Sequence, residues 1–149
     1  MNIIKAKKEH AKAIYALGQL ALGEDENWTQ SQYETECDKQ SAIFLVADFD
    51  GQPGGFIHCD LYADDAHLNL LAVSSRFRNQ GVATALVLQA QYIAIQRGGS
   101  VFSLEVRSQN IPANALYQKL GFEVVGQRKR FYTNPQDAAL IRNKELKEC

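Results

Sequence analysis

Hydrophobic positions along this 149-residue chain recur with two different periods. A period near 3.6 predicts amphipathic helices, and a period of two predicts strands with one buried face. The first pattern predicts helices over residues 9–22, 29–39, 81–97 and 111–120. The second pattern predicts strands over residues 2–6, 42–49, 54–62, 101–107, 122–132 and 138–145, with a further strand that ends at residue 73.

The predicted elements follow one another in the order β-α-α-β-β-β-α-β-α-β-β. Three consecutive strands before the long helix at 81–97 imply a mixed sheet that is antiparallel in its first half. We therefore expect an α/β fold with a mixed, mostly antiparallel sheet of about seven strands, flanked by about four helices. The chain has no internal repeat and no low-complexity linker, so residues 1–149 are expected to form one domain.

The composition excludes several classes of protein. Hydrophobic residues make up 46% of the chain and charged residues 22%, which is typical of a globular domain. A net charge of −1 gives no general attraction to nucleic acid, and no apolar run approaches the length that crosses a membrane. The three cysteines lack the spacing of metal ligands, which indicates reduced thiols in the cytoplasm and no metal site: Cys37, Cys59 and Cys149.

Isolated histidines and a group of aspartates have ordinary structural interpretations. The histidines have no second ligand nearby in the sequence, so surface or hydrogen-bonded core positions are favoured over metal ligation: His10, His58 and His67. The aspartates are interpreted as turn residues, with attraction of a cationic acceptor as the alternative: Asp60, Asp64 and Asp65.

A short loop leads into the long helix with the sequence Arg78-Asn79-Gln80-Gly81-Val82-Ala83. The N-terminus of a helix presents unpaired N–H groups and the positive end of the helix dipole, which suits a phosphate. Gly81 lacks a Cβ, so a ligand can approach the main chain closely, and Arg76 adds positive charge. A glycine that merely reverses the chain direction explains the loop as well.

Glu105 is the first candidate for acid–base chemistry. Alternation over residues 101–107 places it on the face opposite the apolar side chains. A partly buried carboxylate suits a general base that works near neutral pH. A structural ion pair with its same-face neighbour Arg107 explains Glu105 equally well from the sequence alone.

Small and polar residues share one face of the predicted helix at 111–120 with the phenol of a tyrosine: Asn110, Ala113, Asn114 and Tyr117. This combination is typical of a ligand-binding surface. Ordinary core packing of Tyr117 with a satisfied hydroxyl is the alternative.

The order and spacing of these motifs resemble the GCN5-related N-acetyltransferase (GNAT) superfamily. The pattern Arg78-x-x-Gly81-x-Ala83 resembles its acetyl-CoA pyrophosphate loop. The run Leu104-Glu105-Val106-Arg107, then Asn110 and Leu116 to Phe122, is most similar to the branch that acetylates protein N-termini, typified by ribosomal protein alanine N-acetyltransferase.

This resemblance implies a site for acetyl-CoA where two central strands splay apart. It implies that Glu105 is the catalytic base and that Tyr117 protonates the departing thiolate. Backbone groups before and after the loop are implied to hold the cofactor, with a bulge in the strand at 71–73 that directs an N–H toward the thioester carbonyl. The expected cofactor-binding residues are Leu71, Ala72, Val73, Arg78, Asn79, Gln80, Gly81, Val82, Ala83, Thr84, Asn110, Asn114 and Tyr117.

The expected reaction is direct attack of a primary amine on acetyl-CoA, since no cysteine accompanies the base. An α-ammonium has a pKa of about 7.7 to 8.0 and a lysine about 10.4, so one glutamate deprotonates the former more easily. A protein N-terminus is therefore the favoured acceptor. The alternatives are a small amine such as a polyamine or aminoglycoside, a lysine, or a non-catalytic acyl-CoA-binding module.

The acceptor side resembles the same branch less closely. The stretch Arg128-Lys129-Arg130-Phe131-Tyr132 is similar to its Arg-rich, Tyr-Tyr hairpin, and Trp28 to a tryptophan of its acceptor loop. Trp28 and Tyr132 are therefore the expected substrate residues. Leu70 stands where the branch has an asparagine. A solvated strand face explains the basic stretch equally well. Homodimerisation through the last strands is common in the family, and this sequence does not decide it.

Overall fold

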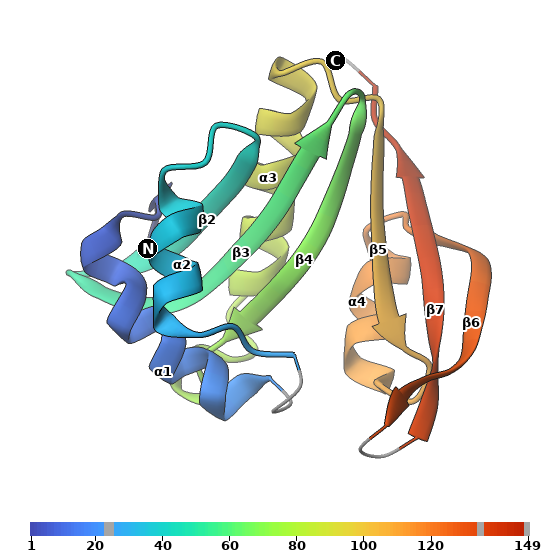
Figure 1. Ribbon diagram of the computed structural model, residues 1–149, viewed down its shortest axis with the longest axis horizontal. Helices are drawn as coiled ribbons and strands as arrows, with labels where there is room; N and C mark the ends of the chain where they lie inside the picture. Colours follow the sequence, from blue (N-terminus) through green and yellow to red (C-terminus); the bar gives the residue numbers. More distant parts are fainter. Residues whose placement is uncertain (23–25, 134–135, 148–149) are drawn as a thin grey trace.

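One seven-stranded sheet, in the order β1-β2-β3-β4-β5-β7-β6, organises the fold (Figure 1). The computed structural model describes residues 1–22, 26–133 and 136–147. The strands are β1 (Asn2–Lys5), β2 (Ala42–Phe49), β3 (Gln52–Tyr62), β4 (Asp65–Val73), β5 (Val101–Arg107), β6 (Glu123–Thr133) and β7 (Gln136–Glu145). The helices are α1 (Ala11–Ala21), α2 (Gln30–Cys37), α3 (Val82–Gln96) and α4 (Ile111–Lys119), with short 3-10 turns η1 (Lys8–His10) and η2 (Ser75–Phe77). The predicted α/β fold and its element order are confirmed.

Local sequence signals account for most of the helix boundaries. Thr29 caps α2, because its hydroxyl accepts a hydrogen bond from the backbone N–H of Gln32 at 3.2 Å while the Gln32 side chain accepts from the Thr29 N–H at 2.7 Å. Asn110 caps α4 in a similar way and accepts from the N–H of Ala113. The sequence also predicts a polar break at 23–27 and a hairpin turn at 133–135, of which residues 23–25 and 134–135 lie outside the described residues.

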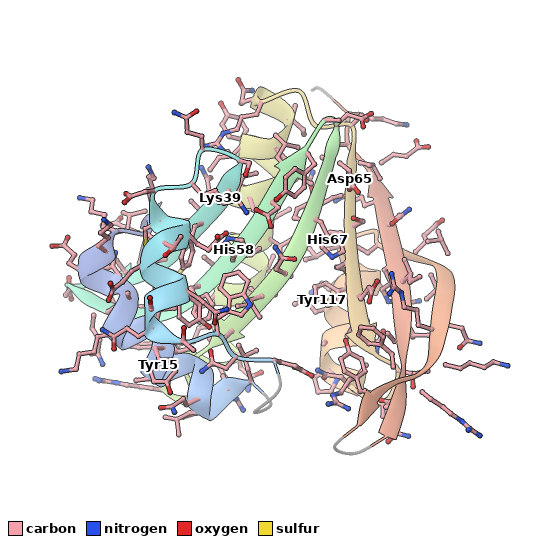
Figure 2. The ribbon with its side chains drawn as sticks, in the orientation of Figure 1. Tyr15, Lys39, His58, Asp65, His67 and Tyr117 are labelled. Carbon is pink, nitrogen blue, oxygen red and sulfur yellow. The ribbon has the colours of Figure 1, made fainter. Side chains whose placement is uncertain are left out.

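The sheet splits between β4 and β5, its only parallel pair in the described chain. The two strands pair from Asp65↔Val101 to Leu68↔Leu104 and then diverge, as Figure 1 shows. Side chains hold the closed end together: the hydroxyl of Ser103 donates to Asp65 at 2.9 Å and lies 2.9 Å from the Nδ1 of His67 (Figure 2). Beyond Leu68, no strand of the described residues pairs with the edge of β4 that faces the split.

A bulge in β4 changes which face its side chains occupy. Cys59 of β3 pairs with Leu68, and His58 pairs with Leu70, so Asn69 is the extra residue. Consequently Leu68 packs into the core beneath α3, whereas Leu70 packs into the core beneath α1 and α2. The bulge implied at residues 71–73 therefore lies earlier in the strand.

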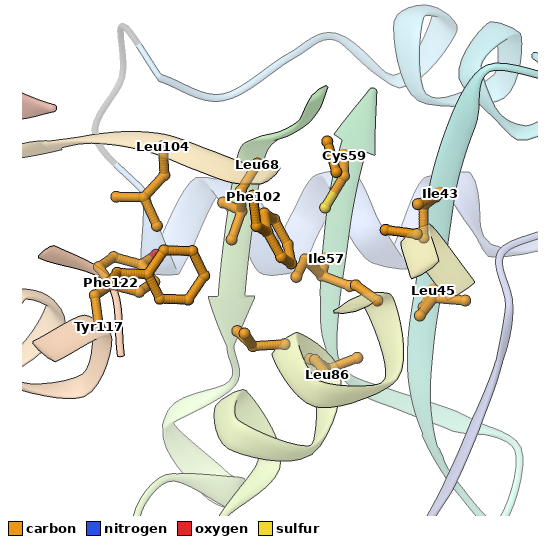
Figure 3. Packing of buried hydrophobic residues seen from close by; sticks show 14 of the residues in the cluster. Ile43, Leu45, Ile57, Cys59, Leu68, Leu86, Phe102, Leu104, Tyr117 and Phe122 are labelled. Atoms are coloured by element: carbon orange, nitrogen blue, oxygen red, sulfur yellow. The ribbon is translucent and has the colours of Figure 1, made fainter. Parts of the chain in front are cut away.

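Two hydrophobic cores cover the two faces of the sheet, because alternate residues of β2 and β3 point in opposite directions. The core on the α3 side, part of which Figure 3 shows, includes Ile43, Leu45, Ile57, Cys59, Leu86, Phe102 and Phe122. The core under α1 and α2 includes Ile14, Tyr33, Phe44, Val46 and Phe56. Both faces are thus fixed, which holds the divergent ends of β4 and β5 in place.

Over the described ranges of the chain, no helix combines the length and apolar character needed to span a membrane.

Candidate active site

The loop before α3 has the geometry of an anion-binding site. Asn79 and Gly81 adopt left-handed conformations, with φ of 61° and 77°. The first turn of α3 carries no acidic residue, so its N–H groups and the positive end of the helix dipole are not neutralised locally. A Cβ added at Gly81 would meet no atom within 4 Å, which means that the main chain here faces open space.

Two stacked rings anchor this loop to the sheet. Phe77 lies against Phe49, with ring centroids 3.9 Å apart and planes 9° from parallel. Gly54 makes the stack possible, because a Cβ at that position would lie 2.5 Å from the ring of Phe49. The stacked rings therefore hold the loop in a fixed position next to the end of β4.

A cavity of about 700 Å³ extends from this loop along the split. It is lined by most of the residues expected to bind the cofactor, namely Leu71, Ala72, Val73, Arg78, Asn79, Gly81, Val82, Ala83, Thr84, Asn110 and Tyr117. Lys119, which the sequence did not single out, adds a second cation beside Arg78. Unpaired N–H groups, two cations and an open main chain at Gly81 fit the pyrophosphate and chain of a CoA thioester.

Two of the expected cofactor residues have other contacts. The side-chain amide of Gln80 donates to the carbonyl of Arg76 at 3.4 Å. Asn114 donates to the carbonyl of Arg107 at 2.9 Å and accepts from the Nε of Arg142 at 3.0 Å, so its side chain holds the connection between β5 and α4. Cofactor binding by their side chains stays a prediction.

A second cavity, of about 360 Å³, opens on the other side of the split. It brings together Glu105 with Trp28 and Tyr132, the expected substrate residues. Its further lining residues include Leu22, Glu26, Asn69 and Phe131. Leu22 and Glu26 flank the undescribed segment at 23–25, and no periodic pattern marked them.

Tyr117 lies where the two cavities meet, since it lines both, together with Leu71, Asn110 and Ala113. Its side chain is only 7% exposed and packs edge-on against Phe122, as Figure 3 shows. Burial, with smaller contributions from Cys59 and Tyr132, raises the pKa of the Tyr117 phenol. Within the part of the chain that the structure describes, the hydroxyl has no hydrogen-bond partner, so the ring belongs to the core without the satisfied hydroxyl of the packing alternative, and a ligand-binding role stays a prediction.

Glu105 pairs with Arg128 of β6, with 3.1 Å between carboxylate and guanidinium. The interpretation that Arg107 is its partner is wrong, because Arg107 pairs with Glu26 at 3.0 Å and its guanidinium carbon lies 4.1 Å from the ring centroid of Tyr132. The alternation of β5 is confirmed, since Glu105 is half-buried on the face opposite Leu104.

The basic stretch forms one wall of the second cavity. The pairing of β6 with β7 shifts between Arg128 and Tyr132, and Arg130 has a φ of 56°. This irregularity turns Phe131 and Tyr132 toward the cavity, with their rings 5.1 Å apart and nearly perpendicular. Arg128 pairs with Glu105, a residue of this cavity, while Lys129 and Arg130 are exposed, so a binding role for the basic stretch stays a prediction.

A buried polar group lies beside the second cavity. His58, which has no exposed surface, contacts Glu36 at 2.8 Å and the side chain of Asn69 at 3.2 Å, so the prediction of a hydrogen-bonded core histidine is confirmed for it. Asp60 belongs to the same group, and its interpretation as a turn residue is wrong. Glu36, His58 and Asp60 could together hold a metal ion, but the ammonium of Lys39 lies 3.6 Å from Glu36 and 3.2 Å from Asp60 and supplies the positive charge (Figure 2).

Comparison with known proteins identifies the family. The model described as the acetyltransferase (GNAT) family matches residues 11–122. A [ribosomal protein bS18]-alanine N-acetyltransferase of Haemophilus ducreyi is 36% identical over 107 residues, which cover 68% of this chain and 71% of that protein. An N-alpha-acetyltransferase of Sulfurisphaera tokodaii is 30% identical over 154 aligned positions, covering 94% of this chain and 90% of the relative.

The fold agrees with this assignment. The crystal structure of the ribosomal-protein-S18-alanine N-acetyltransferase from Escherichia coli superposes with a TM-score of 0.88 at 24% identity, over 99% of this chain and 95% of that one. The family match covers the loop before α3, the split and the first cavity, whereas Phe131 and Tyr132 of the second cavity lie beyond it. The chain belongs to the acetyltransferase (GNAT) family and is an N-acetyltransferase whose acetyl donor is acetyl-CoA.

Proposed function

We propose that the acceptor is the α-amine of a protein N-terminus, with Glu105 as the base and Tyr117 as the acid. The observation that carries this proposal is the position of Tyr117, which lines both cavities while Glu105 lines only the second. A donor in the first cavity and an amine in the second would meet beside the Tyr117 hydroxyl.

The chain's own groups are suited to hold acetyl-CoA in the first cavity. The N–H groups at the start of α3, with Arg78, face the position suited to the pyrophosphate. The free edge of Leu71 to Val73 offers N–H and C=O groups to the pantetheine arm, as a neighbouring strand would. When bound, acetyl-CoA supplies an acetyl group activated as a thioester.

The proton transfers then follow from the positions of two side chains. The Glu105 carboxylate takes a proton from the acceptor ammonium, directly or through one water, which frees the lone pair for attack. The new C–N bond forms as the C–S bond breaks, and the Tyr117 hydroxyl gives its proton to the departing sulfur. Because burial raises the pKa of Tyr117, its hydroxyl keeps that proton at neutral pH. The nitrogen of the new amide then gives its second proton to Tyr117, and Glu105 releases the proton that it took to solvent, which restores both groups.

Several features favour a protein N-terminus over other amines. A single carboxylate as the base suits an α-ammonium, with a pKa of about 8, better than a lysine, with a pKa of about 10.4. Aromatic walls at Trp28, Phe131 and Tyr132 suit a peptide that lies across them. The relatives named above include a [ribosomal protein bS18]-alanine N-acetyltransferase and an N-alpha-acetyltransferase, which supports this proposal. An acceptor on a ribosomal protein would place the reaction in the cytoplasm.

Thiol release from acetyl-CoA tests this proposal on three sets of acceptors. One set holds short peptides with a free α-amine, with the same peptides blocked at that amine as controls. The second set holds peptides whose only free amine is a lysine side chain. The third set holds polyamines and aminoglycosides. Turnover confined to peptides with a free α-amine is the expected result. Turnover only on lysines or small amines would identify a different acceptor class, and CoA binding without turnover on any amine would indicate a binding module.

A further inference from the structure

Asn69 and Glu105 face each other across the mouth of the split. The last paired residues of β4 and β5 are Leu68 and Leu104, so Asn69 and Glu105 occupy the next position on each strand. Both side chains lie on the α2 side of the sheet: Glu105 is opposite the buried Leu104, and Asn69 contacts residues that pack under α2. Both line the second cavity.

The contacts of Asn69 fix the orientation of its side-chain amide. The carboxylate of Asp60 can only accept a hydrogen bond, so the atom 3.0 Å from it must be the Nδ2 of Asn69. The same Nδ2 lies 3.2 Å from the Nδ1 of His58. Both protons of the amide are therefore used on β3, and the carbonyl oxygen Oδ1 is the atom left for another partner.

The tautomer of His58 follows from the same contacts. Its Nδ1 accepts from Asn69, so its proton is on Nε2, which donates to Glu36 of α2 at 2.8 Å. Burial lowers the pKa of His58 more than Asp60 and Glu36 raise it, which agrees with a neutral ring, and Lys39 is the cation that faces this group. Figure 2 shows Lys39 and His58 together beside α2, across the split from Tyr117.

The Oδ1 atom of Asn69 remains accessible to the cavities. Across the described ranges it accepts no hydrogen bond, and it is absent from the buried polar atoms that lack a partner. Asn69 lines the second cavity and also the neighbouring cavity of about 410 Å³ between α2 and β3. An oriented carbonyl oxygen thus lies on the strand opposite the Glu105 carboxylate.

We propose that Asn69 binds the acceptor amine, with its Oδ1 accepting one N–H while Glu105 takes the proton from another. This inference rests on the proposed function and identifies a residue of the acceptor site. After the proton moves to Glu105, the neutral amine still donates to Oδ1, which leaves its lone pair free to point at the acetyl carbon. Asp60 and His58 are positioning residues, because they prevent the amide from turning its NH₂ group toward the amine.

The test compares the steady-state kinetics of Asn69→Ala and the wild type with an acetylated peptide from the panel above. Loss of a hydrogen bond to a charged amine should lower kcat/KM for the acceptor about 10- to 100-fold and leave the KM for acetyl-CoA unchanged. Asn69→Ser keeps an oxygen acceptor on a shorter side chain. Its kcat/KM for the acceptor should therefore lie between those of the wild type and Asn69→Ala. Asn143→Ala, at a half-buried asparagine of β7, is the matched control and should behave as wild type.

Asp60→Ala tests the positioning role. It removes the carboxylate that accepts from the Asn69 amide, so it should weaken acceptor kinetics alone, yet add nothing in the Asn69→Ala background. A merely structural role would instead give additive losses and a change in acetyl-CoA kinetics. Wild-type acceptor kinetics in a folded Asn69→Ala protein would overturn the inference.

Other outcomes separate this inference from the proposed function. If the wild type acetylates only a small amine or a lysine, the proposed acceptor is wrong, and the same variants compared on that amine decide the role of Asn69. If the wild type acetylates no amine at all, both proposals are wrong.

Discussion

The carboxylate of Glu105 lies 3.1 Å from the guanidinium of Arg128, which joins the face of β5 to the irregular part of β6. The Glu105 side chain is 21% exposed and that of Arg128 is 57% exposed, so the pair lies at the rim of the second cavity. The cation on the outer side holds the carboxylate of Glu105, the proposed base, in a fixed orientation. The hairpin of β6 and β7 thereby contributes to the site through charge as well as through its aromatic rings.

Replacing Arg128 should affect activity more than stability. Half-exposed ion pairs contribute little to folding, so Arg128→Gln should change the free energy of unfolding by less than about 1 kcal/mol. Losing the orientation of the base should lower kcat about 2- to 10-fold for any acceptor. Urea unfolding and thiol release measure the two effects. A large loss of stability with unchanged kcat would contradict this role.

Removing the base should leave donor binding intact. Glu105→Gln should lower kcat by about 10²- to 10⁴-fold, because a glutamine cannot accept the ammonium proton. Part of the activity should return above about pH 8, where an α-amine is already neutral. Calorimetric titration with CoA should match the wild type. Glu123→Gln, at an exposed position of β6, is the control and should keep full activity at every pH.

Tyr117→Phe should lower the catalytic rate and leave the packing of the core unchanged. The ring stays in the core and the hydroxyl has no protein partner in the described chain, so the melting temperature should change little. The rate should fall about 10- to 100-fold, since the sulfur then leaves without a proton. Because burial raises the pKa of Tyr117, the wild-type rate should show no fall from ionisation of this phenol up to about pH 10, the ordinary value for tyrosine. Tyr92→Phe, on the exposed surface of α3, provides the comparison, and equal rates in the two variants would exclude Tyr117 as the acid.

Gly81→Ala should weaken CoA binding through two effects. The left-handed φ of 77° makes a Cβ costly by about 1 to 2 kcal/mol, and that Cβ would project into the space above the loop. Gly51→Ala introduces similar strain, at a φ of 91°, in a turn between β2 and β3. Both variants should lose similar stability, and only Gly81→Ala should raise the Kd for CoA, by about 10-fold. Equal CoA affinities would mean that the loop does not bind the pyrophosphate.

Stability should decrease on mild acidification because of His58. Burial lowers its pKa in the folded state, whereas an unfolded histidine has a pKa of about 6.5. As the pH falls below about 6.5, the unfolded chain therefore binds the proton first, and the free energy of unfolding decreases until the folded state also titrates. His58→Gln should flatten this slope between about pH 5 and 7. An unchanged slope in urea-unfolding experiments would show that another group is responsible.

Local patterns in the sequence determined most of the secondary structure and marked several of the candidate site residues. The capping of α2 by Thr29, the capping of α4 by Asn110 and the left-handed turn at Gly81 depend on neighbouring residues, so short windows of sequence contain the necessary information. The same holds for the face of Glu105, which follows from the period of a strand. The loop before α3, a candidate phosphate site, could therefore be located from the sequence, together with both candidate catalytic residues.

Only the tertiary structure decided which partners these residues have. The bulge at Asn69 appears when β4 pairs with β3, and it determines which core Leu70 enters. The pairing of Glu105 with Arg128 depends on β7, which lies between their two strands in the sheet. The sequence by itself specified the family, the order of the elements and the residues capable of chemistry. The contacts of the proposed acceptor site could be identified only from the tertiary structure. Pairing register and side-chain contacts between distant segments depend on the whole sheet rather than on any local pattern.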